Sequence, residues 1–460
     1  MVSEKPKLFG TDGVRGIAGK HPLDRSTVWR IGRALGAILE GAVCSRPRQV
    51  VMGEDTRESS AWISRTVAAG LQSKGIEVAY AGVITTPGVA FLTRHHGFAA
   101  GVVISASHNP YQDNGIKVLS SAGTKLAEAQ ELAIERAIEA EELDAPGTEL
   151  SGAALRVMPG LLEDYLEFLT GLVPRGMPVS RYRLVVDCAH GAALRVAPRL
   201  LEELGIEALI LHTEVNGRNI NLECGSLHPE TMAAATLSRS ADLGVAFDGD
   251  ADRAIFATRE GGIADGDHVL FAVAPHLKLN QLLKGNAVVG TLMTNLGLEL
   301  ALAAEGITLK RTPVGDKYVL EEMVRSGINL GGEPSGHIIF SDISLAGDGL
   351  LTMLQLLLLL AETEKPLSEL VRGLRPFPQI IRNVAVAERP PLGSIPVVAQ
   401  SVAEFQSRFG ERGRVVVRYS GTQSLARVMV EAEDAKAVEH YASQIAAAID
   451  AAAGMKKTIA

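Results

Sequence analysis

The stretch "QVVMGEDTRESSAWISRTVAAGLQSKGIEVAYAG" at residues 49–82 reads as a short apolar strand, a polar loop, an amphipathic helix and, after Gly-Ile, a second strand. The same pattern returns at residues 182–212 and 286–315. In each copy a glycine stands where the end of a helix favours a residue that tolerates positive φ. These glycines are Gly75, Gly205 and Gly306. Strand–helix–strand units with short connections predict parallel strand pairing and right-handed crossovers, so the chain is expected to contain three related α/β domains.

Breaks in this pattern predict the domain boundaries. An acidic, turn-rich segment interrupts it near residues 139–153, a glycine-rich turn follows residue 258, and closely spaced prolines with short alternating strands begin near residue 376. The last segment ends in an amphipathic helix over 435–450 and predicts a small α+β domain. The predicted domains are residues 1–153, 154–258, 259–375 and 376–460.

Composition narrows the class of protein. With 460 residues, 47% hydrophobic and 21% charged, the chain is typical of globular proteins with several domains. Its net charge of −8 argues against a broad surface for nucleic acid or anionic membranes. Three scattered cysteines and a polar start predict a cytoplasmic protein. The most apolar run, residues 350–362, is interrupted by Gln355 and is too short to span a bilayer, so it predicts a buried helix.

The segment "VISASHNPYQDNGIK" at residues 103–117 joins the end of an apolar strand to a polar loop. The strand ends at Ile104, and the residues that follow include Ser107, His108 and Lys117. A buried strand before such a loop is a rigid support for catalytic groups, and it is also a common way to end a strand. The segment alone leaves both interpretations open.

A second strand runs into three carboxylates in "DLGVAFDGDADRAIF", residues 242–256. The aspartates at alternate positions are Asp248, Asp250 and Asp252. Carboxylates this close repel one another unless a cation neutralises them, and hard oxygen ligands suit Mg²⁺. An EF-hand loop also begins with alternate aspartates, but Arg253 stands where that loop requires glycine. The motif predicts a magnesium site, with a solvated acidic turn as the alternative.

A glycine-rich turn, "NLGGEPSGHIIF" at residues 329–340, carries Glu333, Ser335 and His337. A carboxylate and a hydroxyl can hydrogen-bond to neighbouring hydroxyls of a sugar. A simple hairpin turn has the same kind of sequence, so the motif is weak when taken alone.

The C-terminal segment "VVVRYSGTQSLARVMVE" at residues 415–431 predicts a phosphate-binding loop. We expect a strand that leads to Arg418, a loop, and Arg427 just before the next strand. The loop residues are Ser420, Gly421 and Thr422. Two guanidinium groups, two hydroxyls and backbone N–H groups around a glycine can hold a phosphate dianion. A solvated loop between strands is the alternative.

Together these motifs describe a site for phosphoryl transfer. A phosphorylated Ser107 can donate its phosphoryl group if a metal neutralises the oxygens and a base accepts the incoming hydroxyl proton. The sugar loop and the phosphate loop would hold the substrate. Arg15, in the N-terminal turn "LFGTDGVRG", is of interest only in the company of these sites.

The motifs, in this order over essentially the whole chain, resemble those of the α-D-phosphohexomutase superfamily. The matching segments are "FGTDGVRG", "SASHNP" with "DNGIK", "DGDADR", "GGEPSGH" and "RYSGTQSLARVMVE". The resemblance implies an α/β protein with a four-domain phosphohexomutase architecture, in which three related mixed α/β domains and a C-terminal α+β domain surround a central cleft.

The resemblance also implies roles for the residues. Ser107 would carry phosphate as a phosphoserine and, with the three aspartates, bind one Mg²⁺ per active site. His108, Lys117 and Arg15 would assist catalysis. The substrate-binding residues would be Glu333, Ser335 and His337. The phosphate-binding residues would be Arg418, Ser420, Gly421, Thr422 and Arg427.

The implied reaction is an intramolecular phosphotransfer, an isomerisation of glucosamine 6-phosphate and glucosamine 1-phosphate through a bound sugar bisphosphate, which would feed UDP-N-acetylglucosamine synthesis. A sugar bisphosphate could serve as activator, and a homodimer would rest on the resemblance alone. Pro334, Tyr419 and Gln423 depart from the residues most usual for an amino-sugar enzyme. The alternatives are a phosphomannomutase/phosphoglucomutase with the same mechanism, a metal-dependent sugar phosphatase, and a non-catalytic sugar-phosphate sensor.

Overall fold

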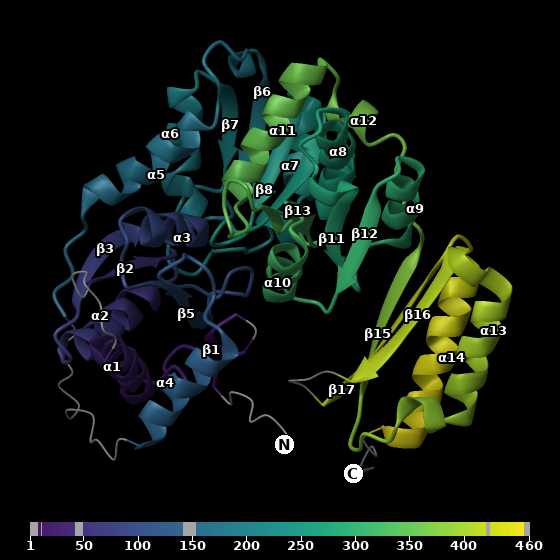
Figure 1. The fold of residues 1–460 in the computed structure, drawn as a ribbon, viewed down its shortest axis with the longest axis horizontal. Coiled ribbons are helices and arrows are strands. Elements are labelled where there is room, and N and C mark those ends of the chain that lie inside the picture. Colours follow the sequence, from purple (N-terminus) through teal and green to yellow (C-terminus); the bar gives the residue numbers. More distant parts are fainter. Residues whose placement is uncertain (1–7, 11, 42–48, 141–152, 420–423, 455–460) are drawn as a thin grey trace. The chain divides into compact units, whose positions relative to one another are not determined.

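The computed structural model describes residues 8–10, 12–41, 49–140, 153–419 and 424–454. The strands of these residues form four β-sheets (Figure 1). The chain divides into two compact units, Met1–Leu292 with Lys310–Val371, and Met293–Leu309 with Arg372–Ala460. The first three sheets belong mainly to the first unit, and the fourth belongs to the second unit. The four sheets confirm the predicted four-domain architecture.

The first domain is built on a five-stranded sheet. In spatial order its strands are β1 (Val14–Ile17), β5 (Asp113–Ser120), β4 (Ala100–Ile104), β2 (Gln49–Glu54) and β3 (Glu77–Val83). Its helices are α1 (Arg25–Gly41), α2 (Ser60–Gln72), α3 (Thr86–His95) and α4 (Glu128–Ala140). Helix α2 has an apolar residue every four positions, at Ile63, Val67 and Leu71. These side chains form a core with α1, α4 and one face of the sheet, and α3 packs on the other face. Because β2, β3 and β4 are parallel, their carboxyl ends share one edge.

The second domain repeats this plan. Its strands, in spatial order, are β10 (Ile263–Ala264), β9 (Ala254–Thr258), β8 (Leu243–Phe247), β6 (Arg183–Asp187) and β7 (Glu207–Leu211). Its helices are α5 (Pro159–Gly171), α6 (Ala197–Glu203) and α7 (Glu230–Ser238). The strands β6, β7 and β8 are parallel, so Asp187 and Asp248 emerge at the same edge of the sheet. Cys188 and Cys224 are buried free thiols, and Cys44 lies outside the described residues.

The third domain has a four-stranded sheet. Its strands, in spatial order, are β12 (Thr308–Thr312), β11 (Ala287–Thr291), β13 (Leu330–Gly332) and β14 (Ile338–Phe340). The helices of this region are α8 (Gly266–Leu279), α9 (Leu296–Ala304), α10 (Asp316–Ser326), α11 (Gly349–Thr363) and α12 (Leu367–Leu370). The apolar run at 350–362 forms most of α11 and is largely buried, as predicted. None of the helices in the described part of the chain combines the length and the apolar character that crossing a bilayer requires.

The helix ends of the repeated unit are as predicted. Gly75, Gly205 and Gly306 have φ values of +71°, +68° and +64°. These angles lie in the left-handed region, where a side chain would add strain. The predicted parallel pairing is confirmed for β2 with β3 and for β6 with β7.

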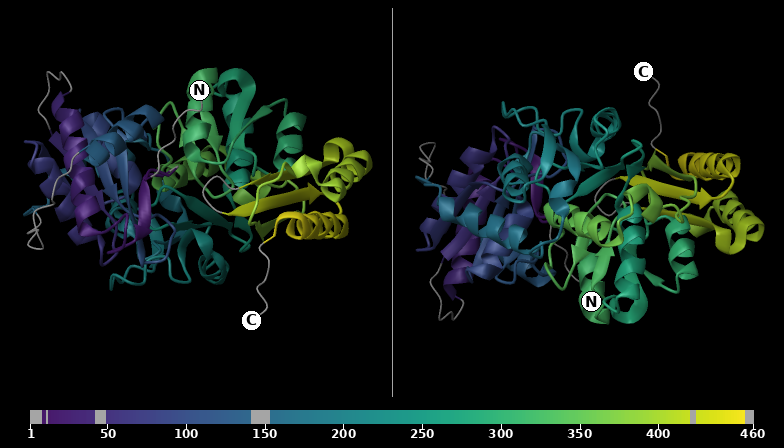
Figure 2. Two further views of the ribbon diagram at one scale, coloured as in Figure 1. Left: turned by 90° about the horizontal axis from the view of Figure 1, so that it is seen from below. Right: turned by 90° about the horizontal axis from the view of Figure 1, so that it is seen from above.

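The C-terminal domain is a three-stranded antiparallel sheet with two helices. Its strands, in spatial order, are β15 (Gln379–Ala385), β17 (Leu425–Ala432) and β16 (Gly413–Tyr419), and its helices are α13 (Pro396–Phe409) and α14 (Ala435–Ala453). Alternate residues of β17, such as Val428 and Val430, form one core with both helices, which lie along the sheet (Figures 1 and 2). The expectation that Arg427 precedes a strand is wrong, because the hairpin register places it inside β17, opposite Arg418.

Candidate active site

The loop after β4 holds Ser107 in a strained, buried position. The five residues of β4 are all buried, and Ser107 follows with a fully buried side chain and a φ of +53°. Its N–H donates to Ser105 Oγ at 2.9 Å. Its Oγ donates to Asp248 Oδ2 at 2.5 Å. Backbone strain of this kind is concentrated at functional sites, and here it points the serine hydroxyl at the aspartate cluster of the second domain.

The three predicted metal ligands lie together at the end of β8. Asp248, Asp250 and Asp252 are buried, and one carboxylate oxygen of each lies within 4.8 Å of the other two. Burial raises the pKa of Asp248 well above its usual range, and repulsion from the other two carboxylates adds to the shift. Asp250 Oδ1 and Asp252 Oδ1 are buried without a hydrogen-bond partner among the described residues. These orphaned oxygens fit a hard divalent cation such as Mg²⁺.

Lys117 supplies the nearest fixed positive charge. It comes from β5, is almost fully buried, and its Nζ lies 2.7 Å from Asp250 Oδ2, 3.6 Å from Asp252 Oδ2 and 3.1 Å from Asp12 Oδ2. Burial alone would lower the pKa of Lys117, but these three carboxylates raise it above its ordinary value. The ammonium therefore stays charged and offsets part of the carboxylate repulsion, and in this state it cannot accept a proton.

His108 has the opposite electrostatic surroundings. Its Nδ1 lies 3.1 Å from Ser107 Oγ and 2.9 Å from Arg253 Nη1. Burial, followed by the charges of Arg253 and Arg15, lowers the pKa of His108 to about 4. The imidazole is therefore neutral at pH 7. Arg15 itself forms an ion pair with Asp12 and donates to the Asn109 side chain of the Ser107 loop at 3.4 Å.

The predicted sugar-reading residues lie in the hairpin between β13 and β14. Glu333 Oε1 accepts a hydrogen bond from Gly315 N at 3.0 Å, and Ser335 Oγ is buried without a partner among the described residues. His337 Nδ1 lies 3.8 Å from Asp252 Oδ2, and its Nε2 lies 3.7 Å from Asp316 Oδ2. Burial opposes protonation, but these two carboxylates raise the pKa of His337 above its ordinary value.

A cavity of about 420 Å³ adjoins these residues. It is lined by Asp252 and His337 from the site, by Asp316 and Lys125, and by apolar side chains of α10 such as Leu320. Lys125 Nζ pairs with Asp316 at 2.7 Å, so the polar wall of the cavity carries both signs of charge. A cavity of this size and mixed polarity can hold a small polar molecule.

The predicted phosphate-binding residues divide into two sets. Ser420, Gly421 and Thr422 lie outside the described residues. Arg418 and Arg427 stand directly opposite each other on β16 and β17. Burial and the neighbouring Arg427 charge lower the pKa of Arg418. Two like charges in direct opposition are unfavourable unless an anion offsets them.

Two residues that the sequence did not indicate support the Ser107 loop. Arg57 is buried after β2, donates from Nη2 to the carbonyls of Ser107 and Asn109 at 2.9 and 2.8 Å, and pairs with Asp55 at 2.8 Å. Asn221 Nδ2 donates to the same two carbonyls at 2.9 and 3.2 Å. Arg57 follows the buried strand β2, so the rule that polar residues after a buried strand are candidate site residues could have identified it.

Comparison with known proteins places the chain in a family. Models of the phosphoglucomutase/phosphomannomutase family match all four domains. The matches are α/β/α domain I at residues 6–145, α/β/α domain II at 163–262, α/β/α domain III at 265–377 and the C-terminal domain at 382–448. The chain belongs to the phosphoglucomutase/phosphomannomutase family.

Within this family, similar proteins carry a more particular name. The phosphoglucosamine mutase of Koribacter versatilis is 50% identical over 463 residues, covering 98% of this chain and 99% of that protein. Among solved structures, a phosphoglucomutase/phosphomannomutase family protein from Burkholderia thailandensis has a TM-score of 0.78 at 25% identity, covering 97% of both chains.

A more distant structure shares the fold. The Aspergillus fumigatus N-acetylphosphoglucosamine mutase, solved in complex with GlcNAc-6P and magnesium, has a TM-score of 0.62 at 19% identity, covering 97% of this chain and 96% of that one. At this identity the likeness establishes a common fold.

Proposed function

We propose that this protein is a phosphohexomutase that interconverts glucosamine 6-phosphate and glucosamine 1-phosphate. The observation that carries the proposal is the 2.5 Å hydrogen bond from Ser107 Oγ to Asp248 within the three-carboxylate cluster. A chain with this site, 50% identical over nearly its full length to a phosphoglucosamine mutase, has the parts that such a reaction needs.

In the proposed reaction the phosphoryl group moves from phosphorylated Ser107 to the free hydroxyl of the bound sugar phosphate. The bond from phosphorus to Ser107 Oγ breaks, a bond from phosphorus to the sugar oxygen forms, and the hydroxyl proton leaves. Lys117 is held charged, whereas His108 is neutral and its Nδ1 lies 3.1 Å from Ser107 Oγ, so we assign proton acceptance to His108. The sugar bisphosphate then turns end for end, and its other phosphoryl group returns to Ser107.

The carboxylate cluster would hold one Mg²⁺ together with Ser107. When bound, the ion would neutralise negative charge on the phosphoryl oxygens. The other residues bind and orient: Glu333, Ser335 and His337 would contact sugar hydroxyls that occupy similar places in both orientations. Arg418 and Arg427, with Ser420, Gly421 and Thr422, would hold the phosphate that is not reacting. Arg15 would keep Asn109, and with it the Ser107 loop, in place.

That the substrate is an amino sugar is the more specific part of the proposal, beyond the phosphohexomutase reaction itself. The family models are described as phosphoglucomutase/phosphomannomutase, so glucose or mannose phosphate is the second candidate substrate. The predicted link to UDP-N-acetylglucosamine synthesis depends on the amino sugar. A sugar bisphosphate activator, a homodimer, a cytoplasmic location and the domain boundaries at 153, 258 and 375 remain predictions.

A parallel assay tests the proposal. Wild type, Ser107→Ala and Ser105→Ala are given Mg²⁺ and glucosamine 1-phosphate, glucose 1-phosphate or mannose 1-phosphate, while isomer formation and released phosphate are measured. We expect preference for the amino sugar, complete loss in Ser107→Ala, and only partial loss in Ser105→Ala, which removes the same atom from the same loop. A preference for glucose or mannose would change the substrate and keep the mechanism. Phosphate release equal to isomer formation would indicate a phosphatase, and turnover in Ser107→Ala would overturn the mechanism.

A further inference from the structure

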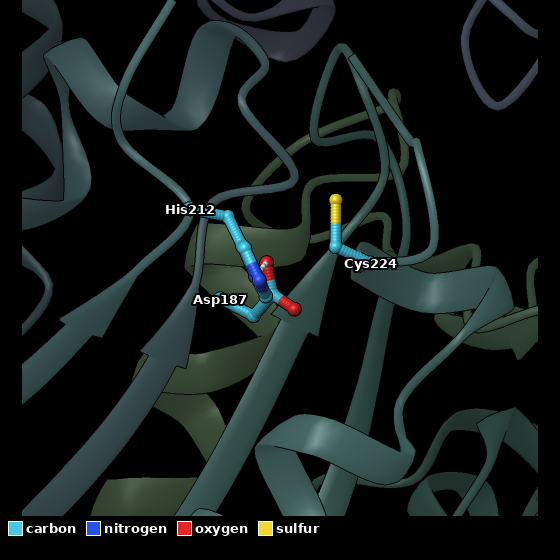
Figure 3. Close-up of side chains that lie close together, drawn as sticks. All are labelled: Asp187, His212 and Cys224. Atoms are coloured by element: carbon cyan, nitrogen blue, oxygen red, sulfur yellow. Dashed lines mark ion pairs between the residues drawn. The ribbon is translucent and has the colours of Figure 1, made fainter. Parts of the chain in front are cut away.

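A second cluster of metal-ligating side chains lies in the second domain, apart from the three aspartates. It consists of Asp187, His212 and Cys224 (Figure 3). Asp187 ends β6, His212 directly follows β7, and Cys224 precedes a short 3₁₀ turn at Gly225–Leu227. Because β6 and β7 are parallel with Asp187 opposite Leu211, the first two ligands emerge side by side at the carboxyl edge of the sheet.

The distances within the cluster suit a small ion. One ligand atom of each residue lies within 4.8 Å of the other two, and Asp187 Oδ1 lies 2.9 Å from His212 Nδ1. Ligands of tetrahedral zinc stand about 3.3–3.7 Å apart, as follows from bond lengths of about 2.0–2.3 Å. Small side-chain rotations would therefore close the set. Asp187 and Cys224 are fully buried, whereas 26% of the His212 side chain is exposed, so the open side of the cluster lies at the histidine.

In this cluster the imidazole nitrogen lacks an aligned hydrogen bond within the described part of the chain, whereas backbone N–H groups satisfy the carboxylate. His212 Nδ1 is buried and, although it is close to Asp187, makes no aligned hydrogen bond among the described residues. No lysine or arginine of the described residues pairs with Asp187. Its two oxygens instead accept from the N–H groups of Ala189 at 2.8 Å and Gly225 at 3.0 Å. Such backbone donors orient a ligating carboxylate while leaving lone pairs for an ion.

A cysteine, a histidine and an aspartate could also form a nucleophilic triad. That alternative fails here, because burial, with a smaller contribution from Asp187, raises the pKa of the Cys224 thiol to about 12. A thiol of this kind is protonated and unreactive at neutral pH.

We propose that Asp187, His212 and Cys224 form a site for a divalent ion of the zinc class, separate from the magnesium cluster. Binding of the ion would displace the Cys224 proton, and the resulting thiolate, with the imidazole, favours such an ion over Mg²⁺, which prefers oxygen. Three protein ligands with one solvent-facing side leave the fourth position to water.

The ion would fasten a segment that reaches the candidate active site. His212 and Cys224 are the two ends of the loop that carries Asn221. Asn221 donates to the carbonyls of Ser107 and Asn109, and the same loop contacts the first domain again where Gly217 O accepts from Glu58 N at 2.9 Å. Binding at the cluster would therefore hold the loop that supports Ser107.

The test uses Co²⁺ as a spectroscopic probe for zinc. The full-length protein is kept in saturating Mg²⁺, which occupies the oxygen-only site, and Co²⁺ is titrated while absorption from thiolate-to-cobalt charge transfer is recorded. We expect one equivalent of Co²⁺ to give this band and Zn²⁺ to remove it. The band should be absent in Cys224→Ser and retained in Cys188→Ser, which alters the other described buried thiol, and in Cys44→Ser.

Two results would overturn the site. One is a folded wild type that gives no band, and the other is a band that persists in Cys224→Ser. Circular dichroism checks that each variant folds. If Cys224→Ser does not fold, His212→Ala is the deciding variant, because the His212 side chain is partly exposed and its loss should be tolerated. We expect the Co²⁺ affinity of this variant to fall at least tenfold. An unchanged affinity would show that His212 is not a ligand and would overturn the proposed site.

Discussion

The second domain carries two ligand clusters at the same edge of the same sheet, and they differ in the charges around them. The first follows β8 and contains three carboxylates, with Lys117 and Arg253 against it. The second follows β6 and β7 and contains one carboxylate, one imidazole and one thiol. We call them the carboxylate cluster and the mixed cluster. The parallel strands determine where ligands gather, whereas the side chains determine which ion can bind.

The charge difference has a structural consequence. In the carboxylate cluster, burial and mutual repulsion raise the pKa of Asp248, and a lysine from the first domain is needed to offset the negative charge. The mixed cluster has a single carboxylate, which two backbone N–H groups satisfy. The carboxylate cluster therefore depends on cations for its stability, and the mixed cluster does not.

The largest expected effect separates the clusters by activity. Asp248→Asn keeps an oxygen for the Ser107 hydroxyl but removes a charge from the proposed magnesium site, so mutase turnover should fall by about 10³-fold or more. Asp187→Asn makes the same change in the mixed cluster and should leave turnover within about tenfold of wild type. Steady-state assays across a Mg²⁺ series measure both. Equal losses would show that the two clusters act as one site.

The next effect concerns stability. Lys117→Met leaves Asp12, Asp250 and Asp252 without their shared counter-ion, so without Mg²⁺ the free energy of unfolding should fall by about 3–5 kcal/mol. Saturating Mg²⁺ should restore more stability to this variant than to wild type, because the ion then supplies the missing charge. Urea unfolding with and without Mg²⁺ measures the difference. Lys125→Met is the matched control, since Lys125 pairs with Asp12 and Asp316 and should gain no extra Mg²⁺ response.

A smaller effect is a pair of opposite pH dependences, which belong to two histidines of the candidate active site that lie near the carboxylate cluster. The pKa of His337 is raised in the folded state, so its stabilising contribution is complete below about pH 6.5 and is lost as the pH rises through the folded value. The pKa of His108 is lowered to about 4, so wild type loses stability as the pH falls from about 6.5 toward 4.

The measurement is the unfolding midpoint of wild type, His337→Gln and His108→Gln over a pH series. The advantage of wild type over His337→Gln should shrink above about pH 6.5, and wild type should weaken relative to His108→Gln below it. Parallel curves for all three proteins would contradict the assigned charge surroundings.

The sequence predicted those parts of the site that follow strand ends. Apolar runs ending at Ile104 and Phe247 indicated the Ser107 loop and the carboxylate cluster, because a buried strand holds the polar residues that follow it on a rigid support. Asn221 could not be found in this way, since it binds backbone carbonyls of a loop 112 and 114 residues away and no side-chain pattern marks a carbonyl acceptor. The predicted position of Arg427, before the strand, was wrong. The alternation of apolar and polar residues does not determine which residues of two hairpin strands pair with each other.

The smallest expected effect tests whether the clusters communicate. Asn221 has a φ of +58°, so Asn221→Gly removes the amide without adding strain, and Arg57 still satisfies both carbonyls. Turnover should therefore fall only about tenfold, which corresponds to about 1.4 kcal/mol. In a double-mutant cycle with Cys224→Ser at saturating Zn²⁺, coupling above about 0.5 kcal/mol is expected if the mixed cluster positions the Asn221 loop. Additive losses would instead show two independent clusters that share only an edge of a sheet.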